Sequence, residues 1–129
     1  MHSLTMHVRD YECDLQGIVN NAQYQHYLEH ARHEYLLSKG LSFAKLTQQQ
    51  IHLVVYRMTL NYHHSLLPGD AFEVRSVWRK PSRVKLLVEQ QVYRPQDDNI
   101  CLSANVEIAC LNPKGRPCWL PQFEALIMA

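Results

Sequence analysis

The feature of this sequence that most limits its fold is one helical pattern near the N-terminus, followed largely by strand patterns. Within residues 22–38 the apolar side chains recur at steps of four, three and four, at Tyr24, Leu28, Ala31 and Tyr35. This spacing predicts an amphipathic helix with one buried stripe. Asn20 and Asn21 are candidate N-cap residues, and Gly40 is placed to end the helix in a left-handed conformation.

Strand patterns account for most of the remaining chain. Leu4, Met6 and Val8 alternate at period two, and the later segments are rich in Val, Leu, Ile and Tyr. The predicted strands are residues 4–13, 51–62, 71–79, 83–94 and 100–111. Turn signals lie at residues 67–70, 80–82, 95–99 and 112–117, and residues 121–128 predict a short C-terminal helix. We therefore expect an α+β fold in which a curved antiparallel sheet covers the helix, with strands left over for self-association.

Length and composition fit one domain over residues 1–129. The chain is 47% hydrophobic and 19% charged, and its formal net charge of +1 argues against nucleic acid as the main partner. No apolar run reaches the roughly 18 residues of a membrane span, and the N-terminus shows no signal-peptide pattern. We expect a cytoplasmic protein without a membrane span.

The cysteines give no sign of a metal or redox motif. Cys13, Cys101, Cys110 and Cys118 are never two to four residues apart, which excludes a zinc knuckle or a thioredoxin-like pair. We expect reduced, partly buried thiols that behave as small hydrophobic side chains.

Asp14 is the first candidate for chemistry, because it lies between a predicted strand and the start of the predicted helix. A helix N-terminus offers unpaired N–H groups that stabilise a developing oxyanion, and a carboxylate opposite it can attack a carbonyl carbon or activate water. Gly17 lets the loop turn back. The alternative is a loop aspartate that only supports a turn.

A second candidate is the H-x-x-E-H pattern of residues 26–30, the zinc signature of inverted zincins. His26 and His30 share one face of a helix, and His33 and Glu34 add further ligand types. Such sites also need a ligand from a second segment. The alternative, a solvated polar helix face, fits the chain better.

A third candidate is the basic turn at residues 79–85, which contains four cations and suits the few phosphates of a small cofactor. The alternative is a basic hairpin that keeps a sheet edge soluble. Four tyrosines are expected in the core rather than in a binding platform: Tyr11, Tyr24, Tyr27 and Tyr35.

Residues 8–32 resemble the opening motif of the 4-hydroxybenzoyl-CoA thioesterase-like family of hotdog-fold acyl-CoA thioesterases. The motif residues occur in order as Asp14, Gly17, Tyr24, Glu29 and Arg32. Residues 61–62 with 67–70, and the turn at 79–82, are similar to two later family segments. Two departures are Asn20-Asn21, where some members have Tyr-His, and Ser65, where the family often has Pro. The Asn-Asn form resembles a branch acting on longer fatty acyl-CoA.

The resemblance implies a hotdog fold, with a long central helix wrapped by a five- to six-stranded antiparallel sheet, in a dimer or homotetramer with sites at the dimer interface. It implies that Asp14 is the catalytic carboxylate and that the backbone N–H near Asn21, beside the Gly17 loop, polarises the thioester carbonyl. The implied substrate and CoA contacts are Arg79, Lys80, Ser82, Arg83 and Tyr24. No metal or redox cofactor is implied.

The function that follows is hydrolysis of an acyl-CoA thioester to a free acid and CoA, with Asp14 acting as nucleophile or as general base. The alternatives are a hotdog hydratase or dehydratase, a non-catalytic acyl-CoA-binding module, and a zinc hydrolase that uses His26 and His30.

Overall fold

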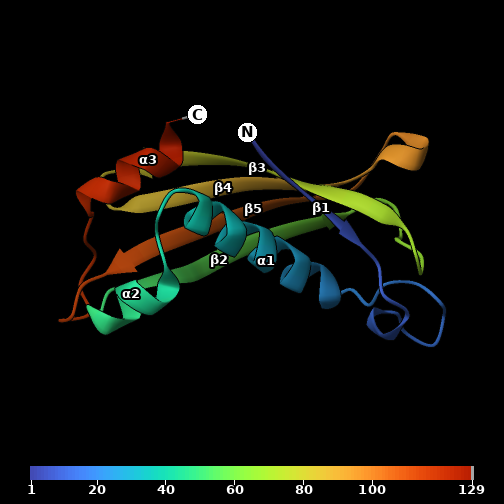
Figure 1. Cartoon of the computed structure of the whole chain (residues 1–129), viewed down its shortest axis with the longest axis horizontal. Helices are drawn as coiled ribbons and strands as arrows, with labels where there is room; N and C mark the ends of the chain where they lie inside the picture. The colour runs from blue at the N-terminus through green and yellow to red at the C-terminus, as the bar shows by residue number, and fades with distance from the viewer. Residues whose placement is uncertain (129) are drawn as a thin grey trace.

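The computed structural model describes residues 1–128, which form one antiparallel sheet with a long helix lying against one of its faces (Figure 1). The strands are β1 (His2–His7), β2 (His52–Tyr62), β3 (Ala71–Ser82), β4 (Lys85–Arg94) and β5 (Asn99–Leu111). Their order across the five-stranded sheet is β1-β3-β4-β5-β2, so β1 and β2 form the two edges. The expected α+β class with a five-stranded antiparallel sheet is confirmed.

The long helix α1 (Gln23–Ser38) follows the predicted periodicity. The four stripe residues are buried, and Tyr27 is buried beside them. Gly40 adopts a positive φ of 76°, and Leu41 N donates to Leu36 O at 2.9 Å, which closes the helix as expected. The N-cap prediction was wrong, because the cap position is Ala22.

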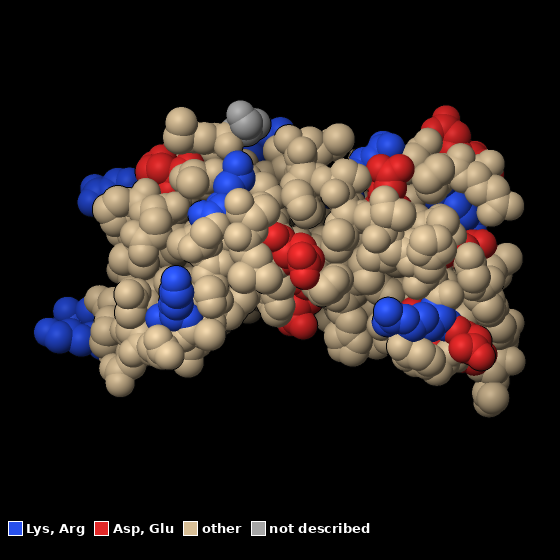
Figure 2. All heavy atoms as spheres, in the orientation of Figure 1, with Lys and Arg blue, Asp and Glu red and all other residues tan. Residues whose placement is uncertain are grey.

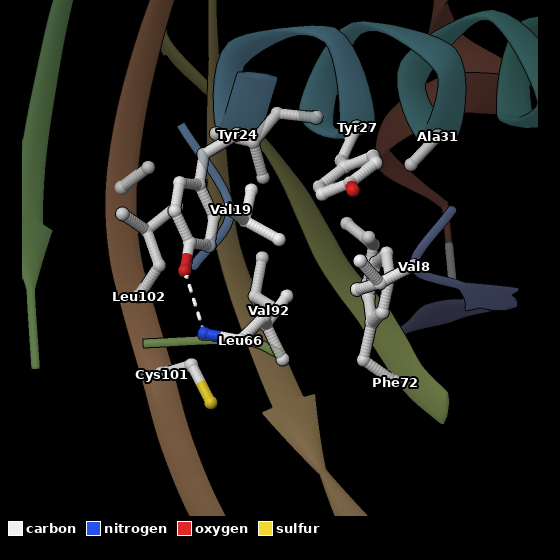
Figure 3. Close-up of a cluster of buried hydrophobic side chains, with 13 residues drawn as sticks. Val8, Val19, Tyr24, Tyr27, Ala31, Leu66, Phe72, Val92, Cys101 and Leu102 are labelled. Atoms are coloured by element: carbon white, nitrogen blue, oxygen red, sulfur yellow. Dashed lines mark hydrogen bonds between the residues drawn. The ribbon is translucent and has the colours of Figure 1, made fainter. Parts of the chain in front are cut away.

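The core lies between α1 and the sheet. Figure 3 shows one cluster, in which Tyr24, Tyr27 and Ala31 point from α1 toward Phe72 and Val92 on the strands. A second cluster joins the C-terminal half of α1 to the opposite end of the sheet. Each large apolar side chain removed from water contributes about 1.5–3 kcal/mol, so the helix stripe is the main attachment of α1.

The first strand is shorter than the predicted residues 4–13. It ends at His7, and Asp10–Glu12 form a short 3₁₀ turn. The side chain of Glu12 accepts a hydrogen bond from Arg9 N at 2.9 Å, which holds this turn. Hydrophobic periodicity alone does not show where a side chain hydrogen-bonds to the backbone and so ends a strand.

The turn between β3 and β4 also differs from prediction. β3 continues through Ser82, and the tight turn lies at residues 83–84 rather than 80–82. The register shifts between Arg79 and Ser82. Pro81 lies inside this irregular stretch, where its missing N–H costs no ladder hydrogen bond.

Four further short helical segments complete the fold within residues 1–128, one of them a 3₁₀ turn (Pro95–Asp97) between β4 and β5. The helix α2 (Phe43–Gln48) was not predicted; Ser42 caps it by accepting a hydrogen bond from Lys45 N at 3.4 Å. The predicted C-terminal helix is present as a 3₁₀ turn (Pro121–Phe123) followed by α3 (Glu124–Ile127). None of the helices within residues 1–128 is long and apolar enough to cross a membrane.

All four cysteines are free thiols, as expected. Cys101 and Cys110 are buried. The Sγ atoms of Cys110 and Cys118 lie 3.2 Å apart, a proximity that their spacing of eight residues did not predict. The strand-like return of the chain after residues 112–117 creates this pair.

Beneath α1 lies a small buried polar cluster. Arg32 donates from Nη1 to Gln90 Oε1 at 3.0 Å, and Gln90 Nε2 donates to Leu28 O and to Ser76 Oγ. Burial lowers the pKa of Arg32 to about 10. Arg32 of the family motif is therefore a buried link between α1 and the sheet.

Candidate active site

Asp14 lies in a small hairpin formed by residues 12–20, which we call the Asp14 hairpin. Three backbone pairings close it: Asn20 N donates to Glu12 O at 3.2 Å, Cys13 and Val19 form a bridge, and Asp14 N donates to Ile18 O at 2.9 Å. The hairpin leads directly into α1. Asp14 is therefore held by pairing on both sides, although it lies outside the main sheet.

The turn of this hairpin depends on Gly17 and on the Asp14 side chain. Gly17 N donates to Asp14 O at 3.0 Å, and Gly17 has a φ of 77°, a conformation that side-chain-bearing residues rarely adopt. Asp14 Oδ1 accepts a hydrogen bond from Gln16 N at 2.9 Å. This is the only hydrogen bond to the Asp14 carboxylate among residues 1–128, so Asp14 Oδ2 is available to a ligand.

The half-buried Asp14 side chain faces a pocket of about 390 Å³ at the start of α1. The lining residues come from the hairpin, the first turn of α1 and the end of β2: Asp14, Gln16, Ile18, Val19, Asn21, Tyr24, Tyr62, His63, His64 and Ser65. The Asn21 N–H donates to no residue within 1–128. A carboxylate and a free amide at a helix N-terminus thus share one pocket.

Neighbouring side chains hold the helix start in place. Tyr62 donates from its hydroxyl to Asn21 O at 3.1 Å. The Tyr24 hydroxyl accepts a hydrogen bond from Leu66 N at 3.0 Å, as Figure 3 shows. Burial raises the pKa of Tyr24 above its ordinary value. Tyr24 therefore borders the pocket while serving mainly as a buried anchor for the loop after β2.

Sequence reasoning missed part of this pocket. Tyr62 was noted only as a family position, and the adjacent His63 and His64 were not singled out. Two consecutive histidines directly after a predicted strand were the available signal. The prediction that Tyr11 lies in the core was wrong, because 75% of the residue is exposed. It lies in the 3₁₀ turn before the Asp14 hairpin.

The basic turn lies at the other end of the molecule from Asp14. The strand β3 joins the two regions. Its first residue, Ala71, pairs with His7 near the Asp14 hairpin, and its last residue, Ser82, lies in the basic turn. At about 3.3 Å per residue, the 12 residues of β3 span about 36 Å. Within one chain the structure therefore brings Tyr24 to the Asp14 pocket but not the basic-turn residues Arg79, Lys80, Ser82 and Arg83.

Acidic side chains already pair with two cations of this turn. Arg79 pairs with Glu89, and Lys80 Nζ lies 3.1 Å from Glu124 Oε1. Lys80 also lies over the Trp119 ring, 4.0 Å from its centroid. Figure 2 shows basic and acidic groups interspersed over the visible face. Arg83, in the tight turn itself, is exposed.

Comparison with known proteins places the chain in a family. Residues 8–125 match the Thioesterase-like superfamily. The chain belongs to this superfamily. A hypothetical protein of known structure from Aquifex aeolicus is 28% identical, with a TM-score of 0.89, over 98% of this chain and 99% of that one. The hotdog fold and the family resemblance are thereby confirmed.

Several relatives of this superfamily member are named as thioesterases, among them one bacterial and one plant protein. The acyl-CoA thioesterase YbgC of Haemophilus influenzae is 30% identical over 86% of this chain and 82% of its own length. The chloroplastic acyl-acyl carrier protein thioesterase ATL3 of Arabidopsis thaliana is 30% identical over 93% of this chain. The chain spans only 63% of the length of that plant relative.

The H-x-x-E-H pattern of this thioesterase-like chain lies on the outside of α1. His26, Glu29 and His30 are exposed, and His30 Nε2 lies 4.0 Å from Glu34 Oε1. No group of three His, Cys, Asp or Glu side chains within residues 1–128 is arranged to hold a metal ion. The pattern is therefore best explained as a solvated helix face.

Proposed function

We propose that this protein hydrolyses acyl-CoA thioesters, so that a thioester and water give a carboxylic acid and the free thiol of CoA. The observation that carries the proposal is the shared pocket of the Asp14 carboxylate and the free Asn21 N–H. In this arrangement the thioester oxygen accepts a hydrogen bond from Asn21, and Asp14 acts at the carbonyl carbon. Charge developing on the oxygen is stabilised by the N-terminus of α1.

Two roles are open to the Asp14 carboxylate, and ¹⁸O found on Asp14 after turnover in labelled water would identify the nucleophilic one. As a nucleophile it forms an anhydride with the acyl group and releases the thiolate; as a general base it takes a proton from attacking water. In a single turnover in ¹⁸O-labelled water, a general base gives acid carrying one ¹⁸O atom. An anhydride that water opens at the Asp14 carbon gives unlabelled acid and leaves ¹⁸O on Asp14.

The names of the relatives support thioester hydrolysis and point to two carriers. The Haemophilus influenzae relative is named as an acyl-CoA thioesterase, whereas the Arabidopsis thaliana relative is named for acyl carrier protein. Both carriers present the acyl group on a phosphopantetheine thiol. We propose CoA as the carrier, with acyl carrier protein as the second candidate that the plant relative favours.

We propose further that the protein is a homo-oligomer, dimer or tetramer, built through β2. This edge strand carries Val54, Val55 and Tyr56, each about 40% exposed. An open edge with apolar side chains is a template for pairing with a second chain. Antiparallel pairing of β2 with its copy places the Tyr62 end of one strand beside the His52 end of the other, next to the Asp14 pocket.

The same pairing supplies a place for the acyl group. An apolar cavity of about 350 Å³ lies between α1, α2 and the first half of β2, lined in part by Leu36, Phe43, Leu53 and Ile108. In the proposed dimer this cavity faces the partner's Asp14 pocket. We also propose that Arg79, Lys80, Ser82 and Arg83 reach the CoA phosphates from a neighbouring protomer, because they are remote from Asp14 in their own chain.

The reaction proposed here uses only a carboxylate, an amide and water, so it requires no metal or redox cofactor. Activity is then expected to survive treatment with a chelator, which a zinc hydrolase would not. The free cysteines fit the reducing cytoplasm, which we retain as the proposed compartment.

The test is a panel of acyl-CoAs of varied length and aromaticity, together with acyl carrier protein thioesters, assayed by released thiol. Hydrolysis of acyl-CoA that is lost in Asp14→Asn supports the proposal. Binding without turnover indicates a binding module, and addition of water to enoyl-CoA without thiol release indicates a hydratase. Light scattering tests the assembly, since a monomer near 15.1 kDa contradicts the shared interface.

A further inference from the structure

Glu12 is a buried carboxylate that the mechanism above does not use. Only 8% of the residue is exposed. Its Oε1 accepts hydrogen bonds from the Tyr27 hydroxyl at 2.7 Å and from Arg9 N at 2.9 Å, and its Oε2 accepts one from Gln23 Nε2 at 3.3 Å. No Lys, Arg or His within residues 1–128 forms a salt bridge with it.

Burying a carboxylate is costly unless hydrogen bonds or a counter-charge compensate for lost hydration. Here neutral donors alone provide the compensation. The burial of Tyr27 and its hydrogen bond to Glu12 raise the pKa of Tyr27 well above its ordinary value, so the tyrosine stays a donor. An apolar residue at position 12 avoids this cost, so the position of the carboxylate calls for a specific reason.

The contacts of Glu12 join two structures that build the candidate site. Its side chain bonds to Gln23 and Tyr27 in the first turns of α1. Its own carbonyl oxygen accepts the Asn20 N–H that closes the base of the Asp14 hairpin. One residue therefore ties the hairpin carrying Asp14 to the helix whose start carries Asn21.

We propose that Glu12 is a positioning residue: it fixes the Asp14 hairpin against α1, so that the Asp14 carboxylate and the Asn21 N–H face the same thioester. This inference rests on the proposed function. Glu12 lies at the base of the hairpin and acts through Asp14, not on the substrate. A misplacement of about 1 Å at a reacting group can cost on the order of 10²-fold in rate.

The test compares Glu12→Ala, Glu12→Gln and Asp10→Ala in the full chain. Glu12→Ala removes both side-chain acceptor oxygens and so all three hydrogen bonds, and we expect kcat to fall about 10–100-fold while KM stays within about twofold. Glu12→Gln keeps an amide oxygen for Tyr27 and Arg9, and we expect it to restore kcat to within about threefold of wild type. Asp10 is the matched control, since it is an exposed carboxylate in the same turn.

Two kinetic outcomes overturn the proposal. Unchanged kcat in Glu12→Ala means that the hairpin does not need this anchor. Loss of activity in Glu12→Gln equal to that in Asp14→Asn means that Glu12 itself supplies a carboxylate to the chemistry. If Glu12→Ala does not fold, Tyr27→Phe removes one donor alone, and a fall in kcat of about two- to fivefold at constant KM is expected. Unchanged kcat there contradicts the proposal.

Amide hydrogen exchange separates failure of this inference from failure of the proposed function. The Asp14 and Asn20 N–H groups close the hairpin, so their exchange is expected to accelerate at least about tenfold in Glu12→Ala, but not in Asp10→Ala. In Tyr27→Phe the same amides are expected to accelerate to a smaller extent. Unchanged exchange in both Glu12→Ala and Tyr27→Phe overturns the positioning role, even if no thioester proves to be a substrate.

Discussion

The Asp14 end and the basic-turn end of the molecule differ in how the structure arranges the expected site residues. At one end, the Asp14 hairpin and the start of α1 bring Asp14, Asn21 and Tyr24 into one pocket. At the other end, the basic turn carries the expected cations, but Arg79 and Lys80 are engaged by Glu89 and Glu124. The pocket at the first end is formed within one chain, whereas the basic turn is remote from it and, in our proposal, meets the substrate from a neighbouring protomer.

The difference lies in how far apart in sequence the partners are. The backbone pairings that close the hairpin around Asp14 fall within residues 12–20, so strand, turn and helix signals predict much of its local structure. The acid that neutralises Lys80 lies 44 residues away, and only the docking of α3 on β3 brings it there. A local motif therefore predicts which residues lie together better than a local charge run does.

The largest effect is expected at the Asp14 end. Asp14→Asn keeps the shape of the side chain and its Oδ1 acceptor but removes the carboxylate charge, so kcat should fall about 10²–10⁴-fold on the best acyl-CoA. Thermal melting should barely change, because the half-buried side chain packs little. Asp10→Asn is the control. A folded variant that retains more than about a tenth of kcat makes Asp14 a turn residue only.

Tyr24→Phe tests whether Tyr24, in the same pocket, anchors the loop after β2 or contacts the substrate. The change removes the buried acceptor of Leu66 N, and we expect a loss of about 1–3 kcal/mol in the free energy of unfolding, or about 3–10 °C in Tm. Tyr62→Phe is the control, since its hydroxyl bond to Asn21 O is exposed. A rise in KM in Tyr24→Phe without a loss of stability would indicate that Tyr24 contacts the substrate.

The double variant Arg79→Ala/Lys80→Ala tests the opposite end. We expect KM for acyl-CoA to rise about 3–10-fold with kcat unchanged, and more at low salt, because phosphate contacts are screened by ions. A shorter thioester that lacks the nucleotide phosphates provides the control and should show no change. An unchanged KM for acyl-CoA places the phosphates elsewhere.

The smallest effect is expected for Glu124→Gln, which frees Lys80 from its ion pair. Because the Glu124 side chain is 49% exposed, the pair contributes less than about 1 kcal/mol to stability. KM should fall by up to about twofold if Lys80 meets a phosphate. Glu34→Gln, on the exposed face of α1, controls for the loss of one charge. An increased KM in Glu124→Gln would mean that the pair orients Lys80 for binding.

The sequence by itself determined the helix of residues 22–38, most strand positions and the proximity of Asp14 to a helix start. These features follow from periodicity, turn residues and a glycine with positive φ, all of which act over a few residues. It misplaced the ends of β1 and β3, the N-cap and Tyr11. The end of β1, for example, depends on Glu12 accepting the Arg9 N–H, a contact that periodicity does not encode.

Only the tertiary structure decided which residues surround Asp14 and which cations remain free. The end of β2 supplies Tyr62, His63 and His64 to the pocket from about 50 residues away along the chain. The sheet separates the basic turn from Asp14 by the length of β3, and α3 brings Glu124 to Lys80. The physical reason is that side-chain identity fixes local conformation, whereas long-range neighbours depend on how the strands pair and how α1 packs on them.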